Sequence, residues 1–306
     1  MNIRLADLID EGALVHVEES RRFYAAKQAA GGQRGPTSYE ELQEARRKLD
    51  GSQTGASRAV EHIAAAGGRQ VPVRITSPTS GRSSAVHLDI HGGGFYMDSA
   101  ARNDSPNECL ADALGVTVVS VEYRLAPEHP WPAAPDDCET AALWLLDEGR
   151  RVFGTERILA GGASAGATLV MTTLLRLRDR GLVNRIAAAV LQFGAFDLSG
   201  MSPGGRLYAD EWFIQAYAGH LSDRTDPDVS PLYGDLRGLP PALILAGTLD
   251  ILLEDNLAMA ARLLAAGNEV DIRLYPEAMH GFTFHSTSMA AHALDGIEAW
   301  LASRTR

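Results

Sequence analysis

The sequence predicts an α/β protein built on a mostly parallel central sheet with helices on its flanks. The main observation is a regular alternation, from about residue 69 onward, between short β-rich runs and longer segments with helical apolar spacing. The chain has 306 residues, of which 45% are hydrophobic and 22% are charged, so it can bury a large core. Two domains are allowed at about 150 residues per domain, but one large α/β domain with a smaller appendage fits equally well.

The alternating part of the chain supplies both the strands and the helices of this sheet. The predicted strands are Val71–Thr76, Ala85–Ile90, Val116–Val121, Arg157–Gly161, Ile186–Gln192, Ala242–Ala246 and Val270–Tyr275. The predicted helices are Pro135–Val152, Ala165–Arg180, Glu254–Ala266 and Ser288–Ala302.

Two regions depart from the alternation. Residues 1–50 carry helical apolar spacing and then a charged, glutamate-rich stretch, Tyr39–Lys48, without any period-two pattern. Between Phe196 and Leu239, a turn-rich loop at 200–205 precedes a predicted amphipathic helix, Leu207–Leu221. This second region is therefore a candidate insertion over the sheet.

Charge and composition exclude several classes of function. A net charge of −11 and a pI near 5.3 argue against nucleic-acid binding, which relies on clustered Lys and Arg. The N-terminus lacks a secretory signal, and no apolar run approaches the roughly 18 residues of a membrane span. Two cysteines, Cys109 and Cys138, are too few for a disulfide scaffold. We expect a cytoplasmic protein without integral membrane association. For the oligomeric state, both a monomer and a homodimer are compatible with the sequence.

A candidate nucleophile follows the predicted strand Arg157–Gly161. Gly162-Ala163-Ser164-Ala165-Gly166 is a G-x-S-x-G pattern that opens directly onto a helix, the context in which a sharp turn exposes a serine hydroxyl. A phosphate-binding turn is the alternative, but Ala167 stands where a P-loop has its lysine. For this pattern taken alone, a purely structural glycine-rich turn is a further alternative interpretation.

The serine needs a base and an orienting acid, and two loops offer them. Asp250 follows the predicted strand Ala242–Ala246, and His280 follows the strand that ends at Tyr275. Both lie at the carboxyl edge of the sheet, in the order Ser, Asp, His that this arrangement uses. Asp250 could instead cap a helix, and His280 could be an ordinary loop histidine. The substitutes we consider are Glu254, Asp255 and His285.

A third element, His91-Gly92-Gly93-Gly94-Phe95, follows the predicted strand Ala85–Ile90. Glycines let backbone amides approach a developing oxyanion, so we predict the N–H groups of Gly93, Gly94 and Ala165 as an oxyanion hole. A plain glycine turn is the alternative.

These motifs together resemble the hormone-sensitive-lipase-like branch of the α/β-hydrolases, which includes many bacterial carboxylesterases. Further matches are Tyr123 to Pro130, Pro135-Asp136-Asp137 and His280-Gly281-Phe282, and the similarity spans roughly residues 70–300. The chain departs from the family pattern at the sharp turn around Ser164, called the nucleophile elbow. Here Ala163 replaces an aspartate and Ala167 replaces a glycine. Ile251 also stands where the family usually has the proline after its catalytic acid.

The resemblance implies an α/β-hydrolase fold with a helical cap. It assigns residues 1–50 to an N-terminal cap segment, 200–225 to a cap insertion, and 51–199 with 226–306 to the catalytic domain. It gives Arg124, Glu128 and His129 a structural role near the oxyanion loop. The aromatic residues expected at the acyl pocket are Phe23, Tyr24, Trp212, Phe213 and Tyr217. Alternatively, these aromatic residues hold the small core of the cap itself.

The expected reaction is acyl transfer from a short- or medium-chain carboxylic ester to water, with no metal and no organic cofactor. A capped, partly polar cleft lacks the broad apolar surface of an interfacial lipase. An amidase, lactonase or deacetylase with the same triad is the alternative. A non-catalytic receptor on this fold is expected to lose a triad member, and this chain retains all three.

Overall fold

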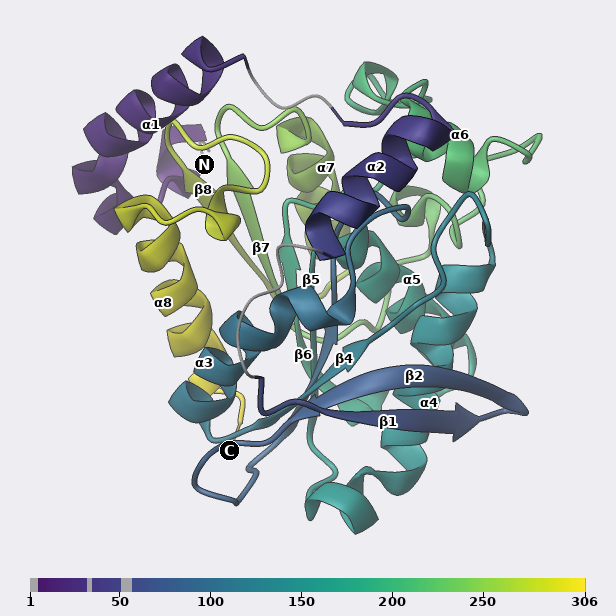
Figure 1. Cartoon of the computed structure of the whole chain (residues 1–306). Coiled ribbons are helices and arrows are strands. Elements are labelled where there is room, and N and C mark those ends of the chain that lie inside the picture. The colour runs from purple at the N-terminus through teal and green to yellow at the C-terminus, as the bar shows by residue number, and fades with distance from the viewer. Residues whose placement is uncertain (1–4, 32–34, 51–56, 306) are drawn as a thin grey trace.

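The computed structural model describes residues 5–31, 35–50 and 57–305. Within them, eight strands form one sheet in the order β1-β2-β4-β3-β5-β6-β7-β8 (Figure 1). β1 and β2 pair antiparallel, as do β2 and β4, while every other neighbouring pair is parallel. The strands are β1 Val60–Ala66, β2 Arg69–Thr76, β3 Val86–Ile90, β4 Thr117–Val121, β5 Ile158–Ala163, β6 Ile186–Gln192, β7 Ala242–Gly247 and β8 Val270–Tyr275. The predicted fold class is confirmed.

All seven predicted strands are present, but the sequence analysis missed β1. In this edge strand only Ala64 is buried. The strand ends in three alanines, which favour a helix over a strand, so neither alternation nor β propensity marks it. Its pairing with β2 fixes its conformation.

Helices cover both faces of the sheet (Figure 1). The helices α4 (Ala133–Phe153), α5 (Ala165–Asp179) and α7 (Leu253–Ala265) pack on one face, and α3 (Asp104–Leu114) and α8 (Ser288–Ala302) on the other. Between them β3, β4 and β5 are buried along their whole length, as expected for parallel strands covered on both sides. The four predicted helices are confirmed. No helix in these described ranges is long and apolar enough to cross a membrane.

The segments outside this pattern lie near the carboxyl edge of the sheet. Two 3₁₀ turns, η1 (Leu5–Leu8) and η2 (Glu11–His16), lead into α1 (Val17–Ala29), which lies beside β8 and α8 (Figure 1). The next helix, α2 (Tyr39–Asp50), lies on the other side of the molecule, towards α6 (Figure 1). The described parts of the N-terminal segment therefore lie over two separate places of the molecule.

The predicted helix Leu207–Leu221 is wrong in length. The structure has a 3₁₀ turn at Gly205–Leu207 and then a short helix, α6, at Trp212–Ala218. Glu211 is extended and precedes α6, and Gly219 follows its last residue. The predicted boundary between cap and catalytic domain at residue 51 lies outside the described residues, and the division into cap and catalytic parts stays a prediction.

Arg46 fixes α2 to the body of the protein. Its guanidinium donates to the carbonyl oxygens of Tyr96 at 2.9 and 2.7 Å and of Ala126 at 2.7 Å. It also forms an ion pair with Glu128 at 2.8 Å. Because Tyr96 and Ala126 are buried, removal of the guanidinium leaves their carbonyls without this partner.

We predict that Arg46→Met lowers the free energy of unfolding by about 2 to 3 kcal/mol, because charged hydrogen bonds to buried carbonyls are lost. The matched control is Arg47→Met, since Arg47 is 72% exposed and, among the described residues, pairs with Glu44 on the same helix. The control is expected to cost about 0.5 kcal/mol or less. Chemical denaturation of the three proteins measures both values, and equal effects would contradict this account of α2.

Candidate active site

Ser164 lies at the turn between β5 and α5, in a backbone conformation that few residues adopt. Its φ is 54° and its ψ −122°, so a residue with a side chain stands where glycine is normally preferred. Its amide donates to the carbonyl of Gln192 at 2.8 Å, which ties the turn to the end of β6. This is the strained strand-to-helix turn that exposes a nucleophile.

The two glycines of the pattern are required by the close packing of this turn. A Cβ on Gly162 would lie 2.5 Å from the carbonyl carbon of Gly166. A Cβ on Gly166 would overlap the carbonyl oxygen of Ile90 and lie 2.7 Å from that of His91. The start of α5 therefore packs directly on the end of β3, from which the His91–Phe95 loop begins.

The structure brings Ser164, His280 and Asp250 together. The Oγ of Ser164 lies 2.9 Å from Nε2 of His280, and Nδ1 of His280 lies 3.1 Å from both carboxylate oxygens of Asp250. The side chain of Asp250 is fully buried and accepts the Leu252 amide at 2.8 Å. Hydroxyl, imidazole and carboxylate thus form one continuous set of hydrogen bonds at the carboxyl edge of the sheet.

The substitute residues considered from the sequence have other partners. The carboxylate of Asp255 accepts the amides of Phe196 at 2.7 Å and Asp197 at 3.0 Å, as well as the hydroxyl of Tyr208. Burial raises the pKa of Asp255 to about 6. His285 lies 3.3 Å from the Lys27 ammonium. Asp255 thus holds the loop after β6 against α7, apart from the set that contains Ser164.

Tyr123 supports the predicted oxyanion loop from behind. Its hydroxyl lies 3.0 Å from the carbonyl oxygens of both His91 and Gly92, and its ring stacks on His91 with centroids 4.1 Å apart. Gly93 and Gly94 have φ values of 99° and 61°, which favour glycine. A Cβ on Gly92 would lie 2.8 Å from the carbonyl oxygen of Ala163, so this loop passes close to the elbow.

The three predicted oxyanion donors have no other acceptor in the described hydrogen bonds. Across residues 5–31, 35–50 and 57–305, the amides of Gly93, Gly94 and Ala165 donate to no backbone carbonyl. Ala165 is the first residue of α5, so its N–H belongs to the helix N-terminus, where amides are free.

The segment after β4 has structural contacts. Arg124 binds the buried carboxylate of Asp137 through two nitrogens at 2.9 Å. Glu128 pairs with Arg46, and His129 is exposed. None of the three contacts Ser164 in the described structure, in keeping with the structural role that the family resemblance implies.

The five aromatic residues expected at the acyl pocket fall into two groups. Phe23 and Tyr24 on α1 pack near His285, with ring centroids 5.0 and 6.1 Å from its ring. Trp212 and Phe213 on α6 pack against Tyr96. Tyr217 is 1% exposed and stacks on Phe95 at 4.0 Å, so it supports the oxyanion loop from the core.

Phe193, which the sequence analysis did not select, contacts the imidazole of His280. Its fully buried ring packs edge-on against His280 with centroids 5.2 Å apart. Its φ is 40°, unusual for a bulky residue, and its amide donates to Leu245 at 2.7 Å. No sequence pattern marks this residue, since its conformation results from the surrounding structure.

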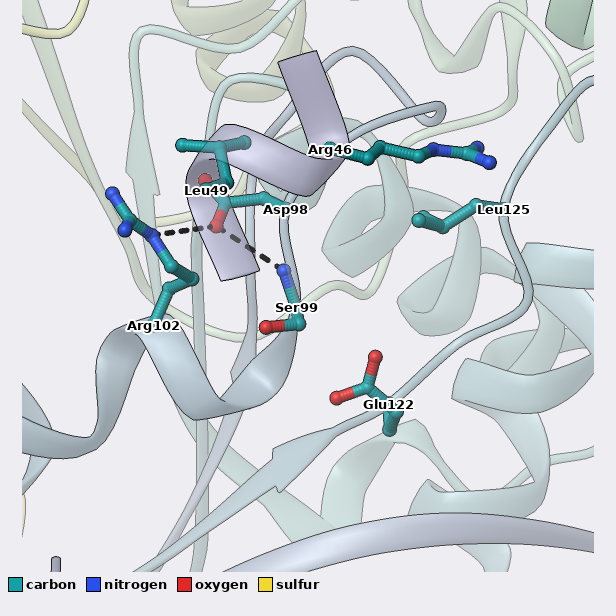
Figure 2. Close-up of a pocket in the computed structure, with 7 residues that line it drawn as sticks. All are labelled: Arg46, Leu49, Asp98, Ser99, Arg102, Glu122 and Leu125. Carbon is teal, nitrogen blue, oxygen red and sulfur yellow. Dashed lines mark hydrogen bonds and ion pairs between the residues drawn. The ribbon is translucent and has the colours of Figure 1, made fainter. Parts of the chain in front are cut away.

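A separate cavity of about 230 Å³ lies beneath α2 (Figure 2). Its lining residues are Arg46, Leu49, Asp98, Ser99, Arg102, Glu122 and Leu125. Asp98 accepts the Ser99 amide at 3.2 Å and pairs with Arg102 at 3.3 Å (Figure 2). Glu122 accepts the Ala100 amide at 2.9 Å. The cavity contains no member of the Ser164 set.

The described residues also contain no group of three His, Cys, Asp or Glu side chains placed to hold a metal ion.

Fold and site geometry together define a protein of the α/β-hydrolase class. A family model described as an alpha/beta hydrolase fold matches residues 87–284. The chain belongs to this family and to its hormone-sensitive-lipase-like branch, as the sequence motifs predicted. A hormone-sensitive lipase from a metagenome library is 28% identical in sequence and superposes with a TM-score of 0.77 over 94% of this chain and 98% of that one.

Two curated relatives carry names that state an activity. The carboxylic ester hydrolase LipN of Mycobacterium tuberculosis is 31% identical over 70% of this chain and 61% of LipN. The ethyl acetate hydrolase of Pseudomonas putida is 31% identical over 70% of this chain and 72% of that relative. The chain thus spans less than two thirds of the length of LipN.

We predict that Gly166→Ala destabilises the fold by about 3 kcal/mol and abolishes activity, because the added methyl group overlaps the end of β3. Gly115→Ala is the control. Gly115 has a positive φ, 63°, unlike Gly166, but a Cβ there meets nothing within 4 Å, so only about 1 to 2 kcal/mol of backbone strain is expected. Denaturation and ester hydrolysis measure both effects. A fully active, equally stable Gly166→Ala would contradict the packing argument.

Proposed function

We propose that this chain is a serine carboxylesterase that hydrolyses short- to medium-chain carboxylic esters through an acyl-enzyme. Its broad class, a carboxylic-ester hydrolase, rests on family membership and on relatives named for that activity. The observation that carries the finer proposal is the continuous hydrogen bonding from Ser164 through His280 to Asp250. Residues 1–50 and 200–225 would form the cap of this enzyme.

In the proposed reaction, Nε2 of His280 takes the Ser164 proton as Oγ attacks the ester carbonyl carbon. The carboxylate of Asp250 holds the proton on Nδ1 and stabilises the imidazolium that forms. The amides of Gly93, Gly94 and Ala165 would bind the oxyanion. The intermediate collapses as His280 protonates the departing alcohol, which leaves an acyl group on Ser164. Water, activated by the same imidazole, then releases the acid.

The surroundings of Ser164 suit this chemistry. Helix α5 begins directly after it, so the positive end of the helix dipole lies where negative charge develops. Asp250 is fully buried, and a buried carboxylate that holds an imidazolium interacts more strongly than one in water. The oxyanion donors are backbone amides, which need little reorganisation during the reaction.

The preference for short acyl groups is supported by bulk beside the oxyanion loop. A Cβ on Gly94 would lie 2.7 Å from the ring of Tyr96 and 3.3 Å from that of Phe213, so these rings crowd the loop. The name of the ethyl acetate hydrolase relative points to the same size of substrate. Amide or lactone hydrolysis by the same residues is the alternative. Parallel ester and amide assays distinguish an esterase from an amidase.

We predict that Ser164→Ala lowers kcat on nitrophenyl acetate by about 10⁴- to 10⁶-fold and removes labelling by a fluorophosphonate probe. Asp250→Asn is expected to lower kcat by about 10⁴-fold, because the imidazole loses its orienting carboxylate. The control is Ser303→Ala, at the end of α8, which should label and turn over like wild type. Equal labelling of Ser164→Ala and wild type would show that another residue is the nucleophile.

We further predict that kcat/KM on nitrophenyl esters peaks at short or medium acyl chains. Phe213→Ala should move the peak to longer chains, since it opens space beside Gly94. Steady-state kinetics over a series of acyl lengths tests both statements. A wild-type maximum on long acyl chains would contradict the proposed substrate class.

A further inference from the structure

One face of α1 contacts the loop that carries His280. Ser20 and Tyr24 lie one turn apart on this helix and are its buried residues, at 2% and 7% exposure. The hydroxyl of Ser20 binds the backbone of the loop between β8 and His280, and the hydroxyl of Tyr24 lies beside that backbone. A helix outside the sheet thereby reaches the residues just before the imidazole.

Ser20 binds Glu277, three residues before His280. The hydroxyl of Ser20 donates to the Glu277 carbonyl at 2.6 Å, and Arg21 binds its carboxylate at 3.0 Å. The amide of Glu277 donates to Thr248 Oγ1 at 3.1 Å. Glu277 has a φ of 54°, a conformation that costs about 1 to 3 kcal/mol for a residue with a side chain. External hydrogen bonds must therefore hold it in place.

Tyr24 lies beside the residue adjacent to His280. Its hydroxyl lies beside the backbone of Met279. Burial raises the pKa of Tyr24, and the nearby carboxylate of Asp250 raises it further, which keeps the phenol neutral. Tyr24 is 7% exposed, so its hydroxyl faces this loop rather than solvent.

The same loop is joined to the loop of the acid. Leu249, next to Asp250, donates its amide to the Ala278 carbonyl at 3.0 Å. Gly247 packs so closely on Ala278 that a Cβ there would overlap the Ala278 carbonyl. A shift of Glu277 or Met279 would therefore also change the distance between the imidazole and Asp250.

We propose that α1 positions the general base, and that Ser20 and Tyr24 are positioning residues that act through Glu277 and Met279 on His280. This proposal rests on the proposed function, in which His280 is the base. It replaces the expectation that Tyr24 lines the acyl pocket. A pocket residue would change substrate binding, whereas a positioning residue changes the rate of proton transfer.

The test compares Ser20→Ala and Tyr24→Phe, each of which removes one hydroxyl. Both are expected to lower kcat by about 10- to 100-fold, because a displacement of about 1 Å in a reacting group has effects of this size, with KM within about threefold of wild type. The control is Thr140→Val. It removes a buried hydroxyl that donates to the Asp136 carbonyl at 2.7 Å on α4, and it should keep kcat within about twofold.

A double-mutant cycle separates positioning from general loss of structure. Each substitution is repeated in a His280→Ala background, with residual hydrolysis of an activated nitrophenyl ester as the readout. If α1 acts through the imidazole, neither substitution lowers this residual rate further. Denaturation confirms that each variant is folded. If Ser20→Ala does not fold, Tyr24→Phe alone provides the test.

Each other outcome has a defined meaning. A further loss in the His280→Ala background, a raised KM with unchanged kcat, or wild-type kcat in both variants overturns the positioning role. If His280→Ala itself keeps wild-type activity, the proposed function fails and the role of α1 fails with it. If His280→Ala lowers kcat strongly while Ser20→Ala and Tyr24→Phe do not, the positioning role is overturned and the proposed function is not.

Discussion

The contact between the start of α5 and the end of β3 is the constraint on which the rest of the site depends. At Gly166 the two backbones approach so closely that no side chain fits. This packing forces the turn at Ser164 into its unusual conformation, which directs the hydroxyl away from the sheet. It also sets the distance between Ser164 and the His91–Phe95 loop, because that loop continues from the same end of β3. One backbone contact therefore positions both the proposed nucleophile and the predicted oxyanion donors.

The remaining groups of the site are held in place by contacts from outside the motifs. Tyr123 binds the oxyanion loop from behind, and Phe193 packs against the ring of His280. Phe193 and Glu277 both have a positive φ, so unfavourable backbone conformations accumulate around the imidazole. Such conformations persist only where neighbouring contacts compensate for them. The geometry around His280 thus depends on segments as distant in sequence as α1 and β6.

The sequence predicted those parts of the molecule in which the local pattern and the final environment agree. The buried strand β6 matches its predicted bounds because a largely apolar run is also what two covered faces require. The edge strand β8 matches its predicted bounds because its residues alternate between apolar and polar along Val270–Tyr275. β1 was missed because edge pairing decides its extent, and α6 was overestimated because the helix starts only after the extended Glu211. The three residues of the Ser164 set could be selected since each follows a strand. Phe193 and the contacts of Ser20 depend on tertiary packing that no local pattern encodes.

The alanine at position 163 shows how this chain supports its elbow without the family's usual acid. Ala163 is 6% exposed and belongs to an apolar cluster with Phe193 and Phe282. A carboxylate there would lose its hydration among these rings, and burial of an unpaired charge is costly. The nearby polar contacts are instead the Thr283 hydroxyl bound to Gln192 at 2.9 Å and the Thr168 hydroxyl bound to the Ala195 carbonyl at 2.6 Å. The turn at Ser164 is therefore held by backbone packing and by hydrogen bonds to β6 and the loop that follows it, without an acid beside Ser164.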